Sequence, residues 1–105
     1  MTSETLDGAS VATRANVYFD GKCVSHSLVL PDGSKKSVGV VLPATLTFKT
    51  GVREVMECVA GSCEYRLADT DTWLKSEAGH RFSVPAHSSF DLRVTEAYHY
   101  ICHFG

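Results

Sequence analysis

Apolar and turn-forming residues alternate in short blocks along most of the chain, and helix-like periodicity is nearly absent. From residue 17 onward, breaks such as Asp20-Gly21, Thr50-Gly51 and Ala78-Gly79 separate apolar segments of about five to nine residues. Inside most segments the apolar residues recur at every second position, which is the period of a half-buried strand. The pattern therefore predicts an all-β protein built from many short strands.

Two neighbouring segments carry more specific expectations. The stretch PDGSKK predicts a hairpin turn, because Pro31 presets its own φ and Gly33 tolerates a positive φ. Residues 38–42 are almost continuously apolar, which predicts a strand covered on both faces. With so many short strands and no helix able to cover a sheet, the chain favours a small closed barrel or jelly roll.

The chain has 105 residues, which suits a single domain. Its first fifteen residues are small and polar, with Arg14 as the one basic residue among them. Composition of this kind predicts a flexible N-terminal extension over residues 1–15, followed by the barrel domain over residues 16–105.

Charge and cysteine content limit the partners and the cellular location that we expect for this protein. The formal net charge is -2, so no basic footprint indicates a nucleic-acid partner. No apolar run approaches the roughly 20 residues that a membrane helix needs. The four cysteines form no C-x-x-C pair and follow no secretory signal, which favours free thiols over a disulfide framework. We therefore expect a cytoplasmic protein that binds neither membrane nor nucleic acid.

Two glycine-bounded segments match the frame of the cupins, which are small double-sheet barrels. In the second cupin motif, a glycine is followed by five residues and a proline, and a histidine ligand stands five positions after the proline. Gly79 and Pro85 fit this frame, but Phe90 occupies the ligand position. Glu54 and Gly61 fit the end of the first motif. The resemblance implies a cupin-like double-stranded β-helix, that is, a jelly-roll barrel.

The metal ligands of that frame are mostly missing. The histidine pair of the first motif would fall within residues 47–50, which read Thr-Phe-Lys-Thr. Three of the four ligand positions are therefore lost, and a lone Glu54 is a poor site for metals that need three or more ligands. We expect no metal.

The remaining histidines do not supply an obvious substitute. His99 and His103 would stand about 13 Å apart on one strand, too far to share an ion. His80 and His87 would lie on opposite faces of an extended segment. A metal site assembled from residues distant in sequence stays open as an alternative.

A closer resemblance covers about residues 16–104. The stretches NVYFDGKCVSHSLVLPDGSKKSVGVVLPATLTF, REVMECVAGSCEYRL and VPAHSSFDLRV, in this order and spacing, resemble a family of short bacterial cupins, the pyrimidine/purine nucleoside phosphorylases. Arg53 departs from the family, whose members often have proline there. The resemblance implies a metal-free pentosyltransferase of broad specificity. It would cleave purine and pyrimidine nucleosides reversibly with phosphate to ribose 1-phosphate and free base, with no cofactor beyond this co-substrate.

This chemistry directs the search for catalytic residues. Glu54 shares a strand face with Met56 and Cys58, so its carboxylate is predicted to accept hydrogen bonds from the ribose hydroxyls inside the barrel. The alternative is a surface glutamate beside Arg53. His87, with an ordinary pKa near neutrality, is the predicted acid for the departing base, unless it is a solvated turn residue.

Substrate-binding residues are predicted by type. Aromatic faces stack on any base, which suits broad specificity, although most aromatics in so small a barrel pack the core. The predicted substrate-binding set is Tyr18, Phe48, Met56, Phe90 and Tyr100. Cations are needed for phosphate, and the predicted set is Lys35, Lys49 and Arg81. Solvated surface charges are the alternative for each of these three residues.

Two further function classes stay open, a non-catalytic ligand-binding cupin and a metal-dependent cupin enzyme. We also expect a homodimer, because a short barrel gains stability by covering its strand edges.

Overall fold

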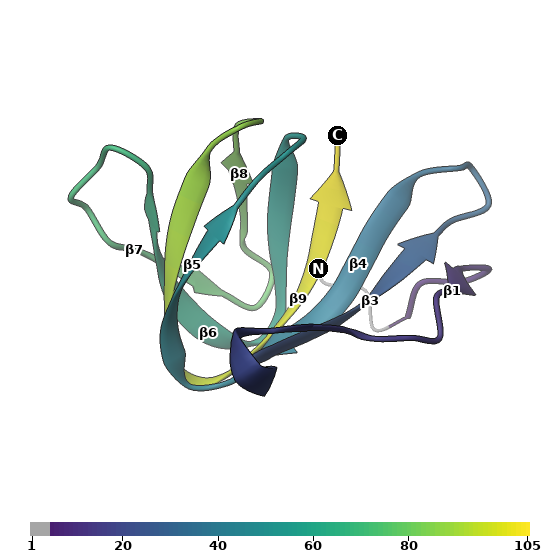
Figure 1. The fold of residues 1–105 in the computed structure, drawn as a ribbon, viewed down its shortest axis with the longest axis horizontal. Helices are drawn as coiled ribbons and strands as arrows, with labels where there is room; N and C mark the ends of the chain where they lie inside the picture. The colour runs from purple at the N-terminus through teal and green to yellow at the C-terminus, as the bar shows by residue number, and fades with distance from the viewer. Residues whose placement is uncertain (1–4) are drawn as a thin grey trace.

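The computed structural model describes residues 5–105, and this part of the chain is built almost entirely of strands (Figure 1). One turn of 3₁₀ helix, η1 (Phe19–Gly21), is the single helical element among them. The strands are β1 (Ser10–Val11), β2 (Asn16–Tyr18), β3 (Cys23–Val29), β4 (Lys35–Val41), β5 (Ala44–Lys49), β6 (Glu54–Leu67), β7 (Leu74–Glu77), β8 (Arg81–Val84) and β9 (Ser89–Phe104). The predicted all-β class is confirmed.

The two longest strands, β6 and β9, organise the sheet. They pair antiparallel from Glu54↔Phe104 to Leu67↔Phe90. The first half of β9 also pairs with β5, and its second half pairs with β4. On the other edge of β6, the first half pairs with β8 and the second half with β7. All nine strands within the described residues are hydrogen-bonded into one continuous network. Because each long strand has different neighbours along its two halves, the network folds into two layers, which we call the two sheets. Figure 1 shows β3 and β4 on one side of the fold and β5, β7 and β8 on the other.

A bulge lets β6 turn from one sheet into the other. The register against β9 shifts at three points between Cys58 and Glu64. Gly61 lies inside this region with φ +74°, and a Cβ there would lie 2.0 Å from the carbonyl oxygen of Ala97. Only glycine fits so close to the neighbouring backbone. The result is the cupin-like double-sheet barrel that the glycine-bounded frame predicts.

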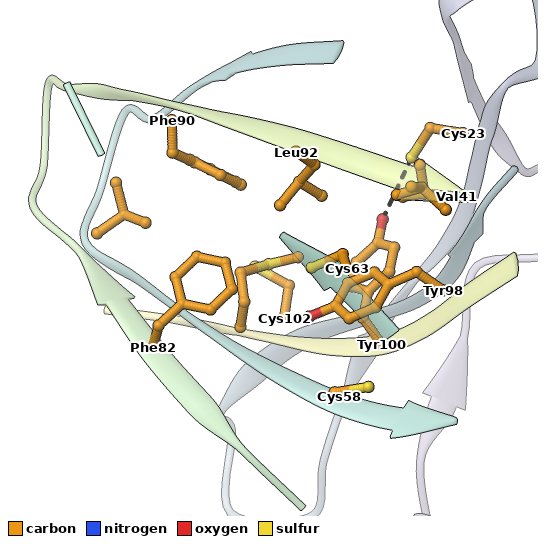
Figure 2. Packing of buried hydrophobic residues seen from close by; sticks show 13 residues of the cluster. Cys23, Val41, Cys58, Cys63, Phe82, Phe90, Leu92, Tyr98, Tyr100 and Cys102 are labelled. Carbon is orange, nitrogen blue, oxygen red and sulfur yellow. Dashed lines mark hydrogen bonds between the residues drawn. The ribbon is translucent and has the colours of Figure 1, made fainter. Parts of the chain in front are cut away.

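Alternating residues of the two sheets fill the barrel (Figure 2). Phe90 and Leu92 enter from one half of β9, and Tyr98, Tyr100 and Cys102 enter from the other half. All four cysteines are buried free thiols. Burial raises the pKa of Cys58 to about 11, so its thiol stays protonated at neutral pH.

Strand β4 is covered less completely than its composition predicts. Ser37 and Val41 are buried in the barrel, whereas Val38 and Val40 are only half-buried on the outer face. These two valines line an outer groove of about 590 Å³ together with residues of β3, β9 and the N-terminal segment. The prediction of a strand covered on both faces is therefore wrong for the single chain. One face of β4 packs in the core, and the other face lines a groove that leaves Val38 and Val40 half-buried.

The N-terminal segment contributes one strand to the sheet. In β1, Ser10 and Val11 pair with Val29 and Leu28 of β3. Residues 1–4 of the extension predicted over residues 1–15 lie outside the described residues. The rest of that extension thus includes a paired strand, while its flexibility and the boundary at residue 16 stay predictions. Within the described part of the chain, no helix is long and apolar enough to span a membrane.

Candidate functional site

A cavity of about 240 Å³ opens at one end of the barrel. Strands β2 to β6 and β9 contribute side chains to it, so both sheets form its walls. Its aromatic lining consists of Tyr18, Phe19, Phe48, Phe90, Tyr100 and Phe104. Its polar lining consists of Ser25, Ser37, Thr47, Lys49 and Glu54, and Met56 and Cys102 complete the wall.

Phenylalanine rings dominate the side formed by β5 and the first half of β9. Phe48 and Phe90 are register partners, and their rings stack with centroids 5.3 Å apart. Phe19 meets the Phe48 ring edge-on at 5.1 Å. Phe90 is buried, whereas Phe48 is only half-buried. Phe48 and Phe19 therefore present the accessible ring surface on this side of the cavity.

A carboxylate, Glu54, lines the cavity from the start of β6. Glu54 is half-buried, and the Cys102 thiol donates a hydrogen bond to Glu54 Oε1 at 3.4 Å. Burial raises the pKa of Glu54 above its usual range, and the thiol hydrogen bond opposes that shift. The cavity thus holds one carboxylate in a partly dry setting, paired with a neutral donor instead of a cation.

Hydroxyl groups of β3, β4 and β9 continue this polar wall. Ser25 accepts a hydrogen bond from Asn16 Nδ2 at 3.3 Å, and the Tyr100 hydroxyl lies 3.5 Å from Cys23 Sγ. Gly39, the register partner of Tyr100, leaves room for that hydroxyl, since a Cβ there would lie 2.8 Å from it. Burial raises the pKa of Tyr100 well above its usual range, so its hydroxyl stays protonated.

The predicted cations fall in three different places. Lys49, at the end of β5, lines the cavity. Lys35 is exposed at the start of β4, on the same strand face as Ser37, but it does not line the cavity. Arg81 lies on the outer face of the sheet, where it pairs with Glu57 at 2.9 Å. Of the predicted phosphate ligands, the structure therefore brings Lys49 alone to the cavity.

Glu57 explains the position of Arg81. Its carboxylate is buried on the outer face of β6 and also contacts His103 Nε2 at 2.8 Å. His103 Nδ1 in turn lies 2.6 Å from Lys36 Nζ. Because a buried carboxylate needs paired partners, we assign Arg81 to this outer cluster of Lys36, Glu57, Arg81 and His103.

His87 does not reach the cavity. It is exposed in the turn between β8 and β9 with φ +53°, and its backbone N–H donates to the Gly51 carbonyl at 3.2 Å. The other predicted site residues, Tyr18, Phe48, Met56, Phe90, Tyr100 and Glu54, all line the cavity.

Several cavity residues were absent from the predicted set. Ser25, Ser37 and Cys102 are small polar residues that occupy inward-facing positions of predicted strands. The inward parity of these residues indicates a functional role, because burying a polar side chain inside a barrel costs free energy unless it finds a hydrogen-bond partner. Phe104 shares the strand parity of Tyr100 and Cys102 on β9, whereas Phe19 reaches the cavity from a 3₁₀ turn, where strand parity gives no guide.

No group of three or more histidine, cysteine, aspartate or glutamate side chains within residues 5–105 is placed to hold a metal ion. Phe90 stands at the ligand position of the second cupin motif and packs with Phe48. Glu54 and Cys102 are the residues of these four types that line the cavity.

An antiparallel double-sheet barrel with a cavity at one open end is the architecture of a cupin-like protein. The family model of the pyrimidine/purine nucleoside phosphorylases matches residues 13–104 of this chain. A relative in Paracidovorax citrulli with that name is 70% identical over 105 residues, and one in Ralstonia nicotianae is 71% identical over 105 residues. Each alignment covers 100% of both chains. The chain belongs to the pyrimidine/purine nucleoside phosphorylase family.

Solved structures agree on the fold. A protein of unknown function from Acinetobacter sp. ADP1 superposes with a TM-score of 0.95 at 40% identity, covering 98% of this chain and 100% of its own. A second such protein, from Vibrio parahaemolyticus, superposes with a TM-score of 0.82 at 34% identity, covering 90% of this chain and 97% of its own.

Proposed function

We propose that this chain is a metal-free pentosyltransferase that cleaves purine and pyrimidine nucleosides reversibly with phosphate, giving ribose 1-phosphate and the free base. The observation that carries the proposal is the lining of the cavity. One carboxylate, Glu54, one cation, Lys49, and six aromatic side chains line the same cavity. The family name of the relatives agrees with this chemistry.

Glu54 acts on the sugar. As an ionised carboxylate it accepts hydrogen bonds from ribose hydroxyls, and its charge favours the oxocarbenium character that develops at the anomeric carbon. Its partner Cys102 donates a weak hydrogen bond and brings no positive charge, so the charge of Glu54 is not neutralised before substrate arrives. Met56 closes the wall next to Glu54.

Aromatic side chains hold the base. Phe48 and Tyr18 offer accessible π-faces to purines and pyrimidines alike, and buried Phe90 supports Phe48 from behind. Stacking of this kind supports broad specificity without hydrogen bonds to base edges. For the departing base, the proposed hydrogen-bond donor is the protonated hydroxyl of Tyr100, a residue of the cavity lining. The geometry gives His87 no such support, since it lies outside the cavity lining.

Lys49 is the phosphate ligand that the geometry supports best. Lys35, at the start of β4, is the second candidate, because its strand face leads toward the cavity. Arg81 is the weakest of the three, since its guanidinium is paired with buried Glu57 on the outer face. The donor set also supports a metal-free reaction, because one carboxylate and one thiol are fewer ligands than transition-metal sites use.

Phosphate dependence tests the proposal. Purified protein incubated with uridine or adenosine is expected to release free base when inorganic phosphate is added, and to release none without it. Liquid chromatography of base and ribose 1-phosphate measures the outcome, and a chelator is expected to leave the rate unchanged. Base release that ignores phosphate would indicate a hydrolase. Nucleoside binding with no release under either condition would indicate a non-catalytic binding cupin.

We further propose a cytoplasmic homodimer that covers the outer groove between the N-terminal segment and β3, β4 and β9. This groove is lined by the half-buried side chains of Val38 and Val40. Beside it, Val11 is 53% exposed on the edge strand β1. A second copy packed on this face would remove both apolar surface and an open edge from water.

Light scattering in solution is expected to give twice the chain mass of 11.4 kDa. Val40→Asp is expected to give the monomer mass, because it places a charge in the groove. Leu74→Asp on β7, which does not line this groove, is the matched control and is expected to leave the dimer intact. A monomeric mass for the unaltered protein would contradict the proposal.

A further inference from the structure

Ser37 is a buried hydroxyl that faces the cavity without a protein partner. It is 6% exposed and lies at an inward position of β4. Among residues 5–105 its side chain makes no hydrogen bond, although it lines the cavity. The side-chain hydroxyls that are fully buried without a partner in the described residues are those of Ser76 and Tyr98, and the Ser37 hydroxyl is not among them. The Ser37 hydroxyl is therefore accessible from the cavity and has no protein partner, so a bound molecule can pair with it.

Two neighbouring serines show that this situation is specific to Ser37. Ser25, which also lines the cavity, is already bonded to Asn16 at 3.3 Å. Ser27, the register partner of Ser37 on β3, is bonded to the same amide at 3.1 Å and does not line the cavity. Asn16 thus satisfies both serines of β3 and leaves the serine of β4 free for a ligand.

The surroundings of Ser37 define which ligand group it suits. Its register partner on β9 is Cys102, and the Cys102 thiol is bonded to Glu54 Oε1 at 3.4 Å. A serine hydroxyl both donates and accepts, whereas an ionised carboxylate only accepts. A pentose hydroxyl, which also both donates and accepts, can donate to Glu54 while it accepts from Ser37. A phosphate oxygen would instead be repelled by Glu54.

We propose that Ser37 binds a ring hydroxyl of the pentose and, together with Glu54, forms the sugar subsite of the cavity. This inference rests on the proposed nucleoside chemistry and adds an orientation to it. The sugar lies against the wall of β4, β6 and the second half of β9, and the base extends toward Phe48 on β5. Ser37 is thereby a residue that discriminates sugars by their hydroxyl groups.

Binding measurements with two nucleosides test the inference. Isothermal titration without phosphate compares uridine with 2′,3′-dideoxyuridine, which has the same base and no ring hydroxyls. In Ser37→Ala, affinity for uridine is expected to fall about three- to tenfold, the effect of one lost hydrogen bond. Affinity for dideoxyuridine is expected to change less than about twofold. Ser27→Ala is the matched control and is expected to bind both nucleosides like the unaltered protein.

Folding does not confuse the result, because the Ser37 hydroxyl has no partner to lose within the described residues. The thermal unfolding midpoint of Ser37→Ala is expected to match or slightly exceed that of the unaltered protein. Equal weakening of both nucleosides, no weakening of either, or failure of the unaltered protein to distinguish them would overturn the inference. Sugar discrimination through Ser37 without phosphate-dependent base release would sink the phosphorylase proposal alone. Phosphate-dependent base release, together with affinities for both nucleosides that Ser37→Ala leaves unchanged, would sink this inference alone.

Discussion

Glu54→Gln is expected to lower kcat/KM for uridine phosphorolysis by about 100-fold or more, the scale of losing a preorganised electrostatic contact to the reacting centre. The amide keeps the shape of the side chain but carries no charge to favour an oxocarbenium-like sugar. Steady-state assays at saturating phosphate measure the loss. Glu64→Gln is the control, because Glu64 pairs with Arg93 at 3.0 Å and does not line the cavity. Unchanged turnover in Glu54→Gln would return Glu54 to a structural role.

The folding stability of Glu54→Gln is expected to stay the same or to rise slightly, although its activity falls. Burial raises the pKa of Glu54, so the unfolded chain ionises this carboxyl more readily than the folded chain does. Ionised Glu54 therefore costs folding free energy once the pH exceeds the ordinary glutamate pKa, and glutamine removes that cost. Near neutral pH, Glu54→Gln is expected to unfold at the same or a slightly higher temperature. For the unaltered protein, activity is expected to fall as the pH drops through the raised pKa of Glu54.

Phe90→Ala is expected to lower the free energy of unfolding by about 3–5 kcal/mol. The ring is 2% exposed and packs between Phe48, stacked at 5.3 Å, and Phe82, edge-on at 5.8 Å. A domain of this size has a total stability of about 5–15 kcal/mol, so the loss is a large part of it. Urea unfolding followed by the fluorescence of Trp73 measures the change.

Phe48→Ala separates packing from substrate binding. Phe48 is half-buried, so its removal is expected to cost less stability than the removal of Phe90. Its exposed face stacks on the base in the proposed complex. The KM for the nucleoside is therefore expected to rise about fivefold or more, since one stacking contact contributes about 1–3 kcal/mol. For the preceding prediction, equal unfolding midpoints of Phe90→Ala and the unaltered protein would show that the Phe90 ring contributes little to the core.

The positions of Phe90 and His87 show what the cupin motif can and cannot predict. The cupin frame locates Phe90 at a ligand position, and the structure shows why a phenylalanine suits it, since the ring fills the barrel beside Phe48. The frame says nothing about His87, whose place was inferred from proximity in sequence. A turn with φ +53° holds His87 in solvent, and the direction of a turn depends on the strands that it joins.

Polar residues on inward strand positions are visible in the sequence itself. Alternation along β4 puts Ser37 on the same face as Val41, and the same count puts Glu54 beside Met56. Both positions follow from strand parity alone, whereas whether Ser37 and Glu54 find hydrogen-bond partners depends on the neighbouring strands. Arg81 lies away from the cavity because it pairs with Glu57 on another strand, and the pairing of those two strands is a long-range contact.

By itself, the sequence determined the all-β class, the inward or outward parity of most strand residues, the loss of cupin metal ligands and the family. These properties depend on local periodicity and on the spacing of a few residues, which the linear chain displays directly. Only the tertiary structure decided which side chains share the cavity, which serine lacks a partner and which cations face away. Those outcomes depend on the pairing of β6 with β9 and on the path of both strands between the two sheets. This pairing brings together residues that are far apart in the sequence, and the sequence does not show which of them will meet.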